Sequence, residues 1–459
     1  MKTKQIDLKN DPIGKLMRHF IVASVLSMVV EALHSVIDSI FIGRYIGSVG
    51  LAAVNSTASI ISWIWAFEVL FASGGCTLNA ILLGEGENEK ARNMFYMTVV
   101  SAMATVIVTA AAVMLFTEEL CLLFGCTEEA LPFGIPYIRI RMAFLVFDCF
   151  NTIMSRFVRN DANVKVVIYA TAATTAVNIM LKFVFLDGFG MKMTGAALAT
   201  GIALASSSAV YLTHFLRPSS KLDLKLTRME FSFSEFGHLF RTGIPFFFTE
   251  SAWALTSIFL NRTLRSLGGT TAIAAMGTMF TIINFVWLVI YGVANAITPI
   301  IGYNHGAGKT DRVMKTLKYG IFLGTLFGLI ATAICIVFCE EIVMVINNSE
   351  KDFIDMAVHA TRINLITMPI TSVAHCVLAF YQAVDKSKTA TVMTILKNTV
   401  FVIVTLFALV YTFGMGIEGV WWTYPVTDLM TLVMCLTAIM ITKRKYHAIS
   451  RGEASAENE

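Results

Sequence analysis

The chain of 459 residues is 56% hydrophobic and only 14% charged, whereas soluble domains carry about 25% charged residues. This composition excludes an ordinary soluble protein and indicates a chain that crosses a membrane many times. The formal net charge of +4 at pH 7 is spread over short loops, so it indicates neither nucleic acid nor an acidic protein as a partner. The eight cysteines form no CxxC pair, and we expect no metal site or disulfide framework.

Twelve apolar segments are long enough to cross a bilayer, because a spanning helix needs about 20 residues. In chain order they cover residues 17–43, 50–82, 93–116, 132–157, 164–186, 193–216, 239–267, 273–301, 312–338, 355–384, 389–411 and 418–442. The longest connection, from Arg217 to Gly237, leaves six segments on either side. We therefore predict an all-α polytopic membrane protein with twelve transmembrane helices.

The two halves of the chain look like copies of one another. IGKLMRH from Ile13 matches FGHLFRT from Phe236, and LGEGENEKAR from Leu83 matches HGAGKTDRVM from His305. An even number of spans gives both halves the same orientation, so we predict two six-helix lobes related by a pseudo-two-fold axis along the membrane normal. The predicted organisation is an N-terminal lobe at 1–216, a cytoplasmic linker at 217–237, a C-terminal lobe at 238–442 and a cytoplasmic tail at 443–459.

Lysine and arginine are concentrated in one set of loops, which includes both ends of the chain and the 217–237 linker. The loops between them are acidic, as in TEELCLLFGCTEEA from Thr117 and CEEIVMVINNSEKDFID from Cys339. Because cytoplasmic loops carry the excess of positive charge, both termini are expected in the cytoplasm. We expect a multi-pass protein of the inner (cytoplasmic) membrane of a cell.

Four segments resemble the MATE family (multidrug and toxic compound extrusion), of bacterial type. They are SVIDSIFIGRYIGSVGLAAVN at 35–55, NIMLKFVFLDGFGMKMTGAALAT at 178–200, GVANAITPIIGYNHGAGKTDRV at 292–313 and FGMGIEGVWWTYPVTD at 413–428. The resemblance covers nearly the whole chain. It implies a secondary active transporter, not an enzyme, which exports cationic, often aromatic drugs or toxic compounds in exchange for protons or sodium by rocking two lobes.

The stretch EALHSVID places three ionisable side chains on one face of an apolar helix, because Glu31, His34 and Asp38 are spaced i, i+3 and i+7. A charge at the bilayer centre costs at least about 2.5–3.5 kcal/mol, so such residues usually face the protein interior and mark function. By the resemblance, Asp38 occupies the acidic position at which proton-coupled relatives bind the proton. We expect these three residues to contribute to ion coupling, with hydrogen bonding between helices as the alternative for Glu31 and His34.

The fifth predicted span departs from the family pattern NxxxD. It reads NIMLK, so Asn178 matches the pattern but Lys182 replaces the acid. Lys182 either pairs with Asp38 as a built-in cation or extends outward to the membrane surface. The departure argues against a proton site built from two carboxylates in this half.

In the second half, Glu250 of GIPFFFTESAW matches an acidic position on the seventh helix of many relatives, and we expect it to face the second-lobe cavity. Sodium-coupled relatives add an acid on the tenth helix. Between Met356 and Val384 this chain has no Asp or Glu, and Asn364 and His375 are the polar candidates. The sequence therefore favours protons over sodium as the coupling ion, and it calls for no cofactor.

Aromatic and methionine side chains suit flat cationic cargo through cation–π contacts and adaptable packing, although most such residues face lipid or core. The expected substrate-cavity residues are Phe246, Trp253, Met276, Asn284 and Trp287. Beyond cationic or aromatic small molecules and membrane lipids, we expect no further partner, and we predict a monomer.

The nearest alternative is a flippase of the same superfamily for a lipid-linked precursor, whose anionic cargo would need a basic cavity. Four basic residues at or near membrane depth keep this alternative open, namely Arg139, Arg141, Lys182 and Arg262. We expect Arg139 and Arg141 to snorkel toward the outer face. An enzyme is disfavoured because the chain lacks HExxH and GxSxG motifs, and a channel or receptor is disfavoured by the parallel repeat.

Overall fold

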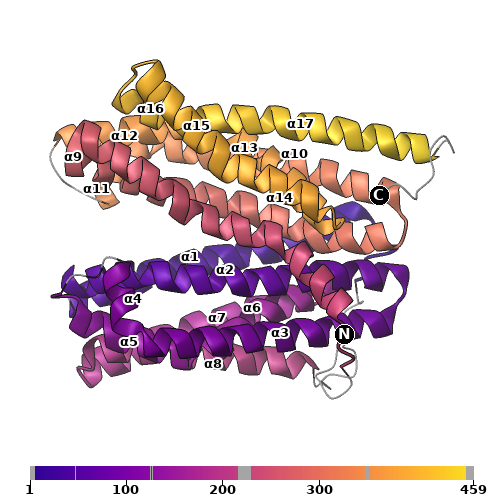
Figure 1. Ribbon diagram of the computed structural model, residues 1–459, viewed down its shortest axis with the longest axis horizontal. Helices are drawn as coiled ribbons and strands as arrows, with labels where there is room; N and C mark the ends of the chain where they lie inside the picture. Colours follow the sequence, from indigo (N-terminus) through magenta and orange to yellow (C-terminus); the bar gives the residue numbers. More distant parts are fainter. Residues whose placement is uncertain are drawn as a thin grey trace. The chain divides into compact units, whose positions relative to one another are not determined.

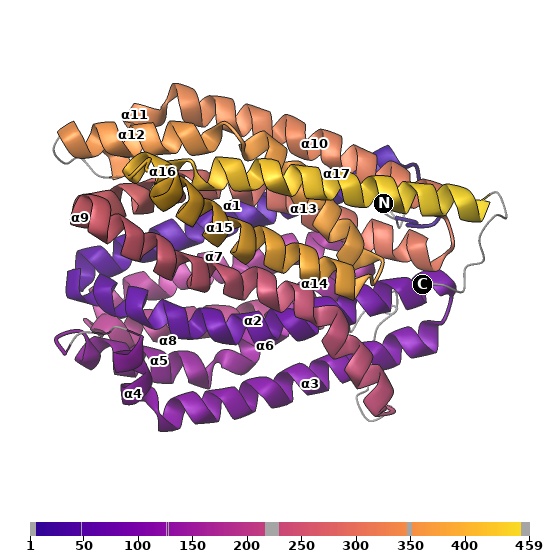
Figure 2. The same ribbon diagram turned by 45° about the horizontal axis from the view of Figure 1, so that its top comes forward.

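The computed structural model describes residues 6–46, 48–124, 126, 128–215, 229–346 and 351–450, and its regular elements are all helices (Figure 1 and, turned by 45°, Figure 2). By its contacts the chain divides into two compact units, Met1–Ser251 and Ala252–Glu459. The first unit contains α1 Ile13–Tyr45, α2 Ser48–Glu85, α3 Asn88–Leu115, α4 Thr117–Leu123, α5 Leu131–Ala143, α6 Leu145–Asn160, α7 Val164–Lys182, the π-helix η1 Phe183–Gly188 and α8 Lys192–Phe215.

A long element, α9 Phe233–Gly306, begins in the first unit and continues into the second. The second unit further contains α10 Thr310–Val337, α11 Cys339–Ile346, α12 Lys351–Leu365, α13 Met368–Ala383, α14 Ser387–Ile395, the π-helix η3 Leu396–Val400, α15 Phe401–Phe407, the π-helix η4 Ala408–Thr412, α16 Ile417–Trp421 and α17 Thr423–Ser450.

The element α9 is two helices joined at Gly269, whose φ of 63° and ψ of −153° are not helical. Glycine adopts this conformation without the steric penalty that a Cβ atom would bring. The junction falls between the predicted spans 239–267 and 273–301, so it accounts for the boundary that the apolar pattern placed there.

In the described part of the chain, nine helices are long and apolar enough to cross a membrane, and the bent pair α12–α13 brings the number to ten. The predicted span 132–157 is helical but more polar, because it is split into α5 and α6 at Phe144 and carries Arg139, Arg141 and Asp148. The predicted span 239–267 is likewise helical within α9 but contains several charged residues. Hydropathy alone therefore undercounts the spans at the two places where the sequence carries most charge.

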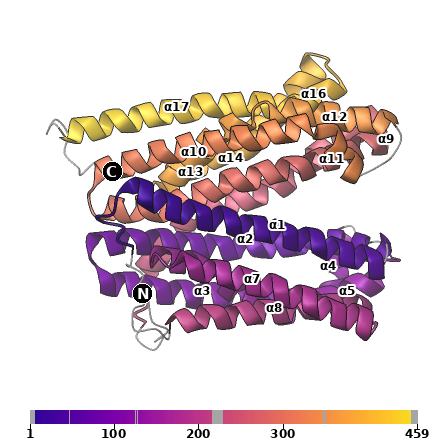
Figure 3. The same ribbon diagram turned by 180° about the vertical axis from the view of Figure 1, so that it is seen from behind.

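In the first unit α7 packs against both α1 and α8, and Figure 3 shows the three helices side by side. Edge-on contact between Phe41 of α1 and Phe183 of η1, with ring centroids 4.7 Å apart, joins this group near the C-terminal end of α1. A hydrophobic core that includes Phe95, Ile138 and Phe157 joins the remaining helices of the unit. This packing brings the polar residues of α1 against those of α7.

Two glycines allow α2 and the start of α9 to approach closely. A Cβ atom at Gly74 would lie 2.6 Å from the backbone oxygen of Leu239, and one at Gly243 would collide with the backbone of Leu70. Because the obstacles are backbone atoms, a side chain at either position must separate the two helices.

We expect Gly243→Val to lower stability by about 1–3 kcal/mol, the usual cost of overpacking. The measurement is the melting temperature in detergent. Gly237 lies on the same helix with nothing within 4 Å of its would-be Cβ, so Gly237→Val serves as the control. Equal melting temperatures for the two variants would show that the close approach contributes nothing to stability.

In the second unit, α13 packs against α10 and α17, and α17 also runs along α15. The chain direction bends by 49° between α12 and α13, and Pro369 lies in the first turn of α13. Proline is tolerated in a first turn, where its missing N–H has no partner to lose, but it cannot continue a preceding helix. The bend brings Asn364 and Thr367 of this broken span against α16 and α17.

Candidate functional site

The centre of the candidate site is an ion pair between α1 and α7. The Lys182 ammonium donates a hydrogen bond to Oδ1 of Asp38. The lysine side chain is fully buried, whereas that of Asp38 is 22% exposed. Of the two arrangements that the sequence left open for Lys182, the structure shows the inward one. A buried ammonium needs such a partner, because an unpaired charge in an apolar interior costs several kcal/mol.

Lys182 is the last residue of α7, and the π-helix η1 begins at the next residue. A π-helical turn is rare and is often found at functional sites. Here the change from α to π coincides with the buried cation.

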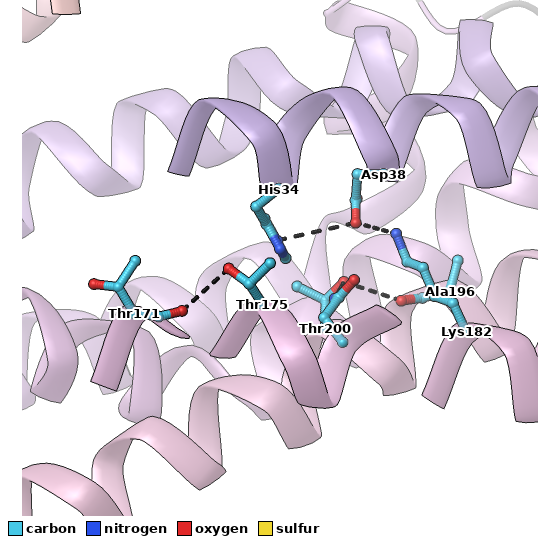
Figure 4. Close-up of polar contacts among 8 residues, drawn as sticks. His34, Asp38, Thr171, Thr175, Lys182, Ala196 and Thr200 are labelled. Carbon is cyan, nitrogen blue, oxygen red and sulfur yellow. Dashed lines mark hydrogen bonds and ion pairs between the residues drawn. The ribbon is translucent and has the colours of Figure 1, made fainter. Parts of the chain in front are cut away.

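His34 is a second neighbour of Asp38, from the same helix α1. Its Nε2 lies 4.0 Å from Oδ1 of Asp38, one turn along the helix, and its Nδ1 is buried without a hydrogen-bond partner among the described residues. Figure 4 shows His34 and Asp38 pointing from α1 toward Thr175 and Lys182. Glu31 belongs to the same helix, but its side chain lies outside the described residues.

Asn178 lies one turn before Lys182 on α7 and is buried, with 1% of its surface exposed. Its Nδ2 donates to Oγ1 of Thr200 on α8 over 3.1 Å, and Thr200 in turn donates to the backbone oxygen of Ala196. Among the residues that the structure describes, the buried Oδ1 atom of Asn178 has no hydrogen-bond partner. This unused acceptor leaves one site close to Lys182 at which a further donor can bind.

Arg141 belongs to the candidate site, although the sequence predicted that it would lie at the membrane surface. The expectation that it snorkels to the outer face is wrong, because its side chain is only 11% exposed and its Nη2 donates to Oδ2 of Asp148 over 3.1 Å. The break between α5 and α6 at Phe144 turns the two residues toward each other. Arg141 also acts electrostatically on Asp38, whereas Arg139 is exposed.

A buried acid on α2 extends this charged group. Glu68 is 2% exposed, and its Oε1 has no hydrogen-bond partner in the described part of the chain. It interacts electrostatically with Asp148, Arg141 and Arg156. Arg156 is itself held by hydrogen bonds to Oγ of Ser73 at 2.9 Å and to a backbone oxygen of α6. The apolar context of span two gave no sign that Glu68 would meet these charges.

Glu250 on α9 is half-buried and belongs to the first compact unit. The charged group that acts on it is Arg156 of α6. The sequence had assigned Glu250 to the second-lobe cavity, because the seventh predicted span lies after the linker. In the structure Arg156 of the first unit acts on it, and its place in the second-lobe cavity stays a prediction.

The expected substrate-cavity residues have different environments. Trp287 stacks on Tyr291 with ring centroids 4.7 Å apart, and Phe246 is half-buried. Met276 is 5% exposed within the hydrophobic core of the second unit, where it fills space, and Asn284 is exposed. The side chain of Trp253 lies outside the described residues. The described members thus differ in their exposure, and a shared cavity for the five residues stays a prediction.

A family model described as MatE matches residues 23–184 and 245–408, most of the chain. The chain belongs to the MatE family. It is therefore a multi-pass membrane transporter and not an enzyme, as the sequence predicted. The two matched segments correspond to the two predicted halves.

Relatives of this MATE transporter include the multidrug export protein MepA of Staphylococcus haemolyticus, 23% identical over 436 residues that cover 93% of this chain and 94% of that protein. MepA of Staphylococcus saprophyticus is 24% identical over 444 residues, which cover 96% of each chain. These proteins match along most of their length, so the likeness includes both halves.

Two solved structures have the same fold. An outward-facing multidrug resistance MATE family transporter of the MOP superfamily superposes with a TM-score of 0.90 at 19% identity, over 97% of this chain and 100% of that one. A MOP superfamily transporter from Pyrococcus furiosus, reported to have a binding pocket of reverse polarity, gives 0.90 at 20% identity over 97% and 99%. The predicted fold class, twelve transmembrane helices in two lobes, is thereby confirmed.

Proposed function

We propose that this MATE transporter exports cationic or aromatic small molecules in exchange for protons, with the Asp38–Lys182 pair at the centre of coupling. The observation that carries the proposal is a fully buried ammonium paired with a carboxylate that keeps 22% of its surface exposed. A proton or a cationic cargo that reaches Asp38 competes with Lys182 for the same negative charge. Multidrug export by the MepA relatives supports the cargo class.

The surroundings of Asp38 favour protons over sodium. Hard metal cations bind shells of several oxygen ligands. Beside Asp38 lie instead the Lys182 ammonium and the His34 imidazole, which supply nitrogen. Within the described residues no cluster of three His, Cys, Asp or Glu side chains could hold a metal ion. A proton needs only one carboxyl oxygen, and it can displace the ammonium without any further ligand.

A lipid-linked precursor flippase remains the second candidate, because Lys182 and Arg141 are buried bases. An anionic cargo would need an excess of positive charge at the site. The first-unit group has no excess of positive charge, because four acids, Asp38, Glu68, Asp148 and Glu250, lie with three bases, Arg141, Arg156 and Lys182. The lack of excess positive charge supports the export of cations.

We propose a monomer in the cytoplasmic membrane with both termini in the cytoplasm, because lysine and arginine gather in the loops on that side. The lobes proposed at 1–216 and 238–442, joined by 217–237 and followed by the tail 443–459, would rock against each other to expose the site alternately.

Inverted membrane vesicles containing the protein test the function and the coupling ion together. We expect ethidium uptake to begin when a proton gradient is imposed without sodium, and a sodium gradient at constant pH to give no more uptake than vesicles lacking the protein. A requirement for sodium would contradict proton coupling. If ethidium is never transported but a fluorescent lipid-linked anion is flipped, the flippase function is the correct one.

A further inference from the structure

Two of the eight cysteines lie together at the end of the short helix α4, which packs against α5 (Figure 1). Cys121 is in α4 and is 1% exposed, and Cys126 follows the helix and is 5% exposed. Both are free thiols in the structure, and neither belongs to the charged group of the first unit. The sequence predicted no disulfide, because it contains no CxxC pair, but the fold brings these two cysteines to one place.

The backbone at the end of α4 sets the distance between the two residues. The N–H group of Cys126 donates to the carbonyl oxygen of Cys121 over 2.9 Å. Such a bond, from two residues beyond the helix cap to the third residue from the helix end, belongs to the Schellman motif, and the side chains of these two residues often touch. The residue before Cys126 in the sequence is Gly125, the residue type that this motif favours. The motif therefore places the two cysteine side chains next to each other.

The sulfur atoms converge on one glycine of α5. A Cβ atom on Gly134 would lie 3.3 Å from Sγ of Cys126 and 4.0 Å from Sγ of Cys121. Because Gly134 has no side chain, the space beside it is shared by the two thiols. A disulfide needs Cβ atoms about 3.5–4.5 Å apart, which neighbouring side chains at a helix end can reach without a change of the backbone.

The charge pattern around the pair is that of an outer loop. The segment contains Glu118, Glu119, Glu128 and Glu129, and the sequence has no lysine or arginine at all between residues 93 and 138. In the orientation proposed above, this loop lies on the side of the membrane away from the cytoplasm. Disulfides persist outside the cytoplasm, whereas thiols inside it stay reduced. The inference therefore rests on the proposed orientation of the transporter.

We propose that Cys121 and Cys126 form a disulfide on the outer side of the membrane, which fixes the end of α4. The oxidant is a disulfide of that compartment, either a small molecule or an oxidase. One cysteine thiolate attacks the oxidant's disulfide and displaces its first thiolate, and the second cysteine thiolate then attacks the sulfur of the first and displaces the other. The cysteines thereby lose two electrons and two protons, and the oxidant leaves as two thiols.

Burial determines when this bond forms and how long it lasts. Burial raises the pKa of the Cys121 thiol to about 11, with Cys126 adding to the shift, and it raises the pKa of Cys126 as well. Because the thiolate is the reactive form, the packed pair reacts slowly, and we expect the bond to form before α4 packs against α5. The same burial should protect the finished bond from dithiothreitol until the protein is denatured.

Peptide mass spectrometry of the full chain tests the inference. The protein is extracted from aerobically grown cells with N-ethylmaleimide present from the moment of lysis. Proteolysis after Glu119 and Glu128 releases Leu120–Glu128, which contains both cysteines and no other. We expect this peptide to carry no maleimide and to be lighter than its dithiol form by two hydrogen atoms. After denaturation and reduction it should carry two maleimide groups.

The double variant Cys121→Ser/Cys126→Ser is the matched control. The other six cysteines are free in the structure, so the denatured but unreduced protein should bind six maleimides with or without the double substitution. Reduction should raise the number to eight in the unaltered protein and leave it at six in the control. Eight maleimides before reduction would overturn the inference.

Labelling of the loop separates oxidation from orientation. Glu129 is exposed, so Glu129→Cys in the double-serine background should react with a membrane-impermeant maleimide in intact cells. If it reacts but Leu120–Glu128 of the unaltered protein carries two maleimides without reduction, the cysteines only fill space and the inference is overturned. If it reacts only in inverted vesicles, the orientation is wrong and the inference falls with it. Ethidium uptake measures export independently in either case, because the pair lies outside the Asp38–Lys182 site.

Discussion

Asp38→Asn should reduce proton-driven ethidium export to the level of vesicles lacking the protein. The amide has the shape of the carboxyl group, and its oxygen can still accept the hydrogen bond from Lys182, so the variant should insert and fold. It cannot bind and release a proton, and it presents no negative charge to a cationic cargo. The measurement is ethidium efflux as a function of pH at matched expression. Glu31→Gln should weaken export less, because it leaves the Asp38–Lys182 pair intact.

The control for Asp38→Asn is Asp352→Asn, which makes the same chemical change at an exposed residue in the first turn of α12. We expect this variant to export at the rate of the unaltered protein. Full activity of Asp38→Asn at every pH would leave the α1 residues with a structural role, and Glu250 would become the leading ion site of the first unit.

Lys182→Met should destabilise the protein and alter its pH dependence. Breaking a buried ion pair by removing one partner costs about 3–5 kcal/mol, because the remaining charge loses its compensation. The melting temperature in detergent should therefore fall, and the double variant Asp38→Asn/Lys182→Met should recover most of that loss without recovering coupled export. The pH profile of any remaining export should move to higher pH, because no ammonium opposes protonation of Asp38.

Lys90→Met is the control for this prediction, since Lys90 is 63% exposed in its side chain and makes only a long contact with Glu87. It should change neither the melting temperature nor the pH profile. If Lys182→Met melts at the same temperature as the unaltered protein, the ion pair contributes no stability. If its profile is also unchanged, Lys182 has no influence on Asp38.

Much of the fold was readable from the sequence because long apolar runs dominate it. The pairing of Lys182 with Asp38 was one of two options, since an ammonium within an apolar helix must either find an acid or reach the surface. Arg141 could not be placed in the same way, because the break at Phe144 that turns it toward Asp148 depends on the packing of α5 and α6. Its position near the end of a span suggested snorkelling instead.

The grouping of His375, Lys397 and Asp428 in the second unit could not be predicted from the sequence either. His375 and Asp428 were visible as separate polar residues, and Lys397 as an isolated base in an apolar segment. They come from three different spans, and they meet where α13, which follows the bend after Leu365, packs against α17. A single sequence shows which residues are costly to bury, but not which of them neutralise one another across helices.

The π-turns change which side chains share a helix face. A π-turn contains about one residue more than an α-turn, and one residue corresponds to about 100° of rotation. The side chains of α15, which follows η3, are therefore rotated relative to an uninterrupted helix that continues from α14, whereas no helix continues directly after η1 or η4. A helical wheel drawn from Ser387 would assign residues beyond Val400 to the wrong face. A cysteine-accessibility scan from α14 to α15 should accordingly show a phase jump just after Lys397.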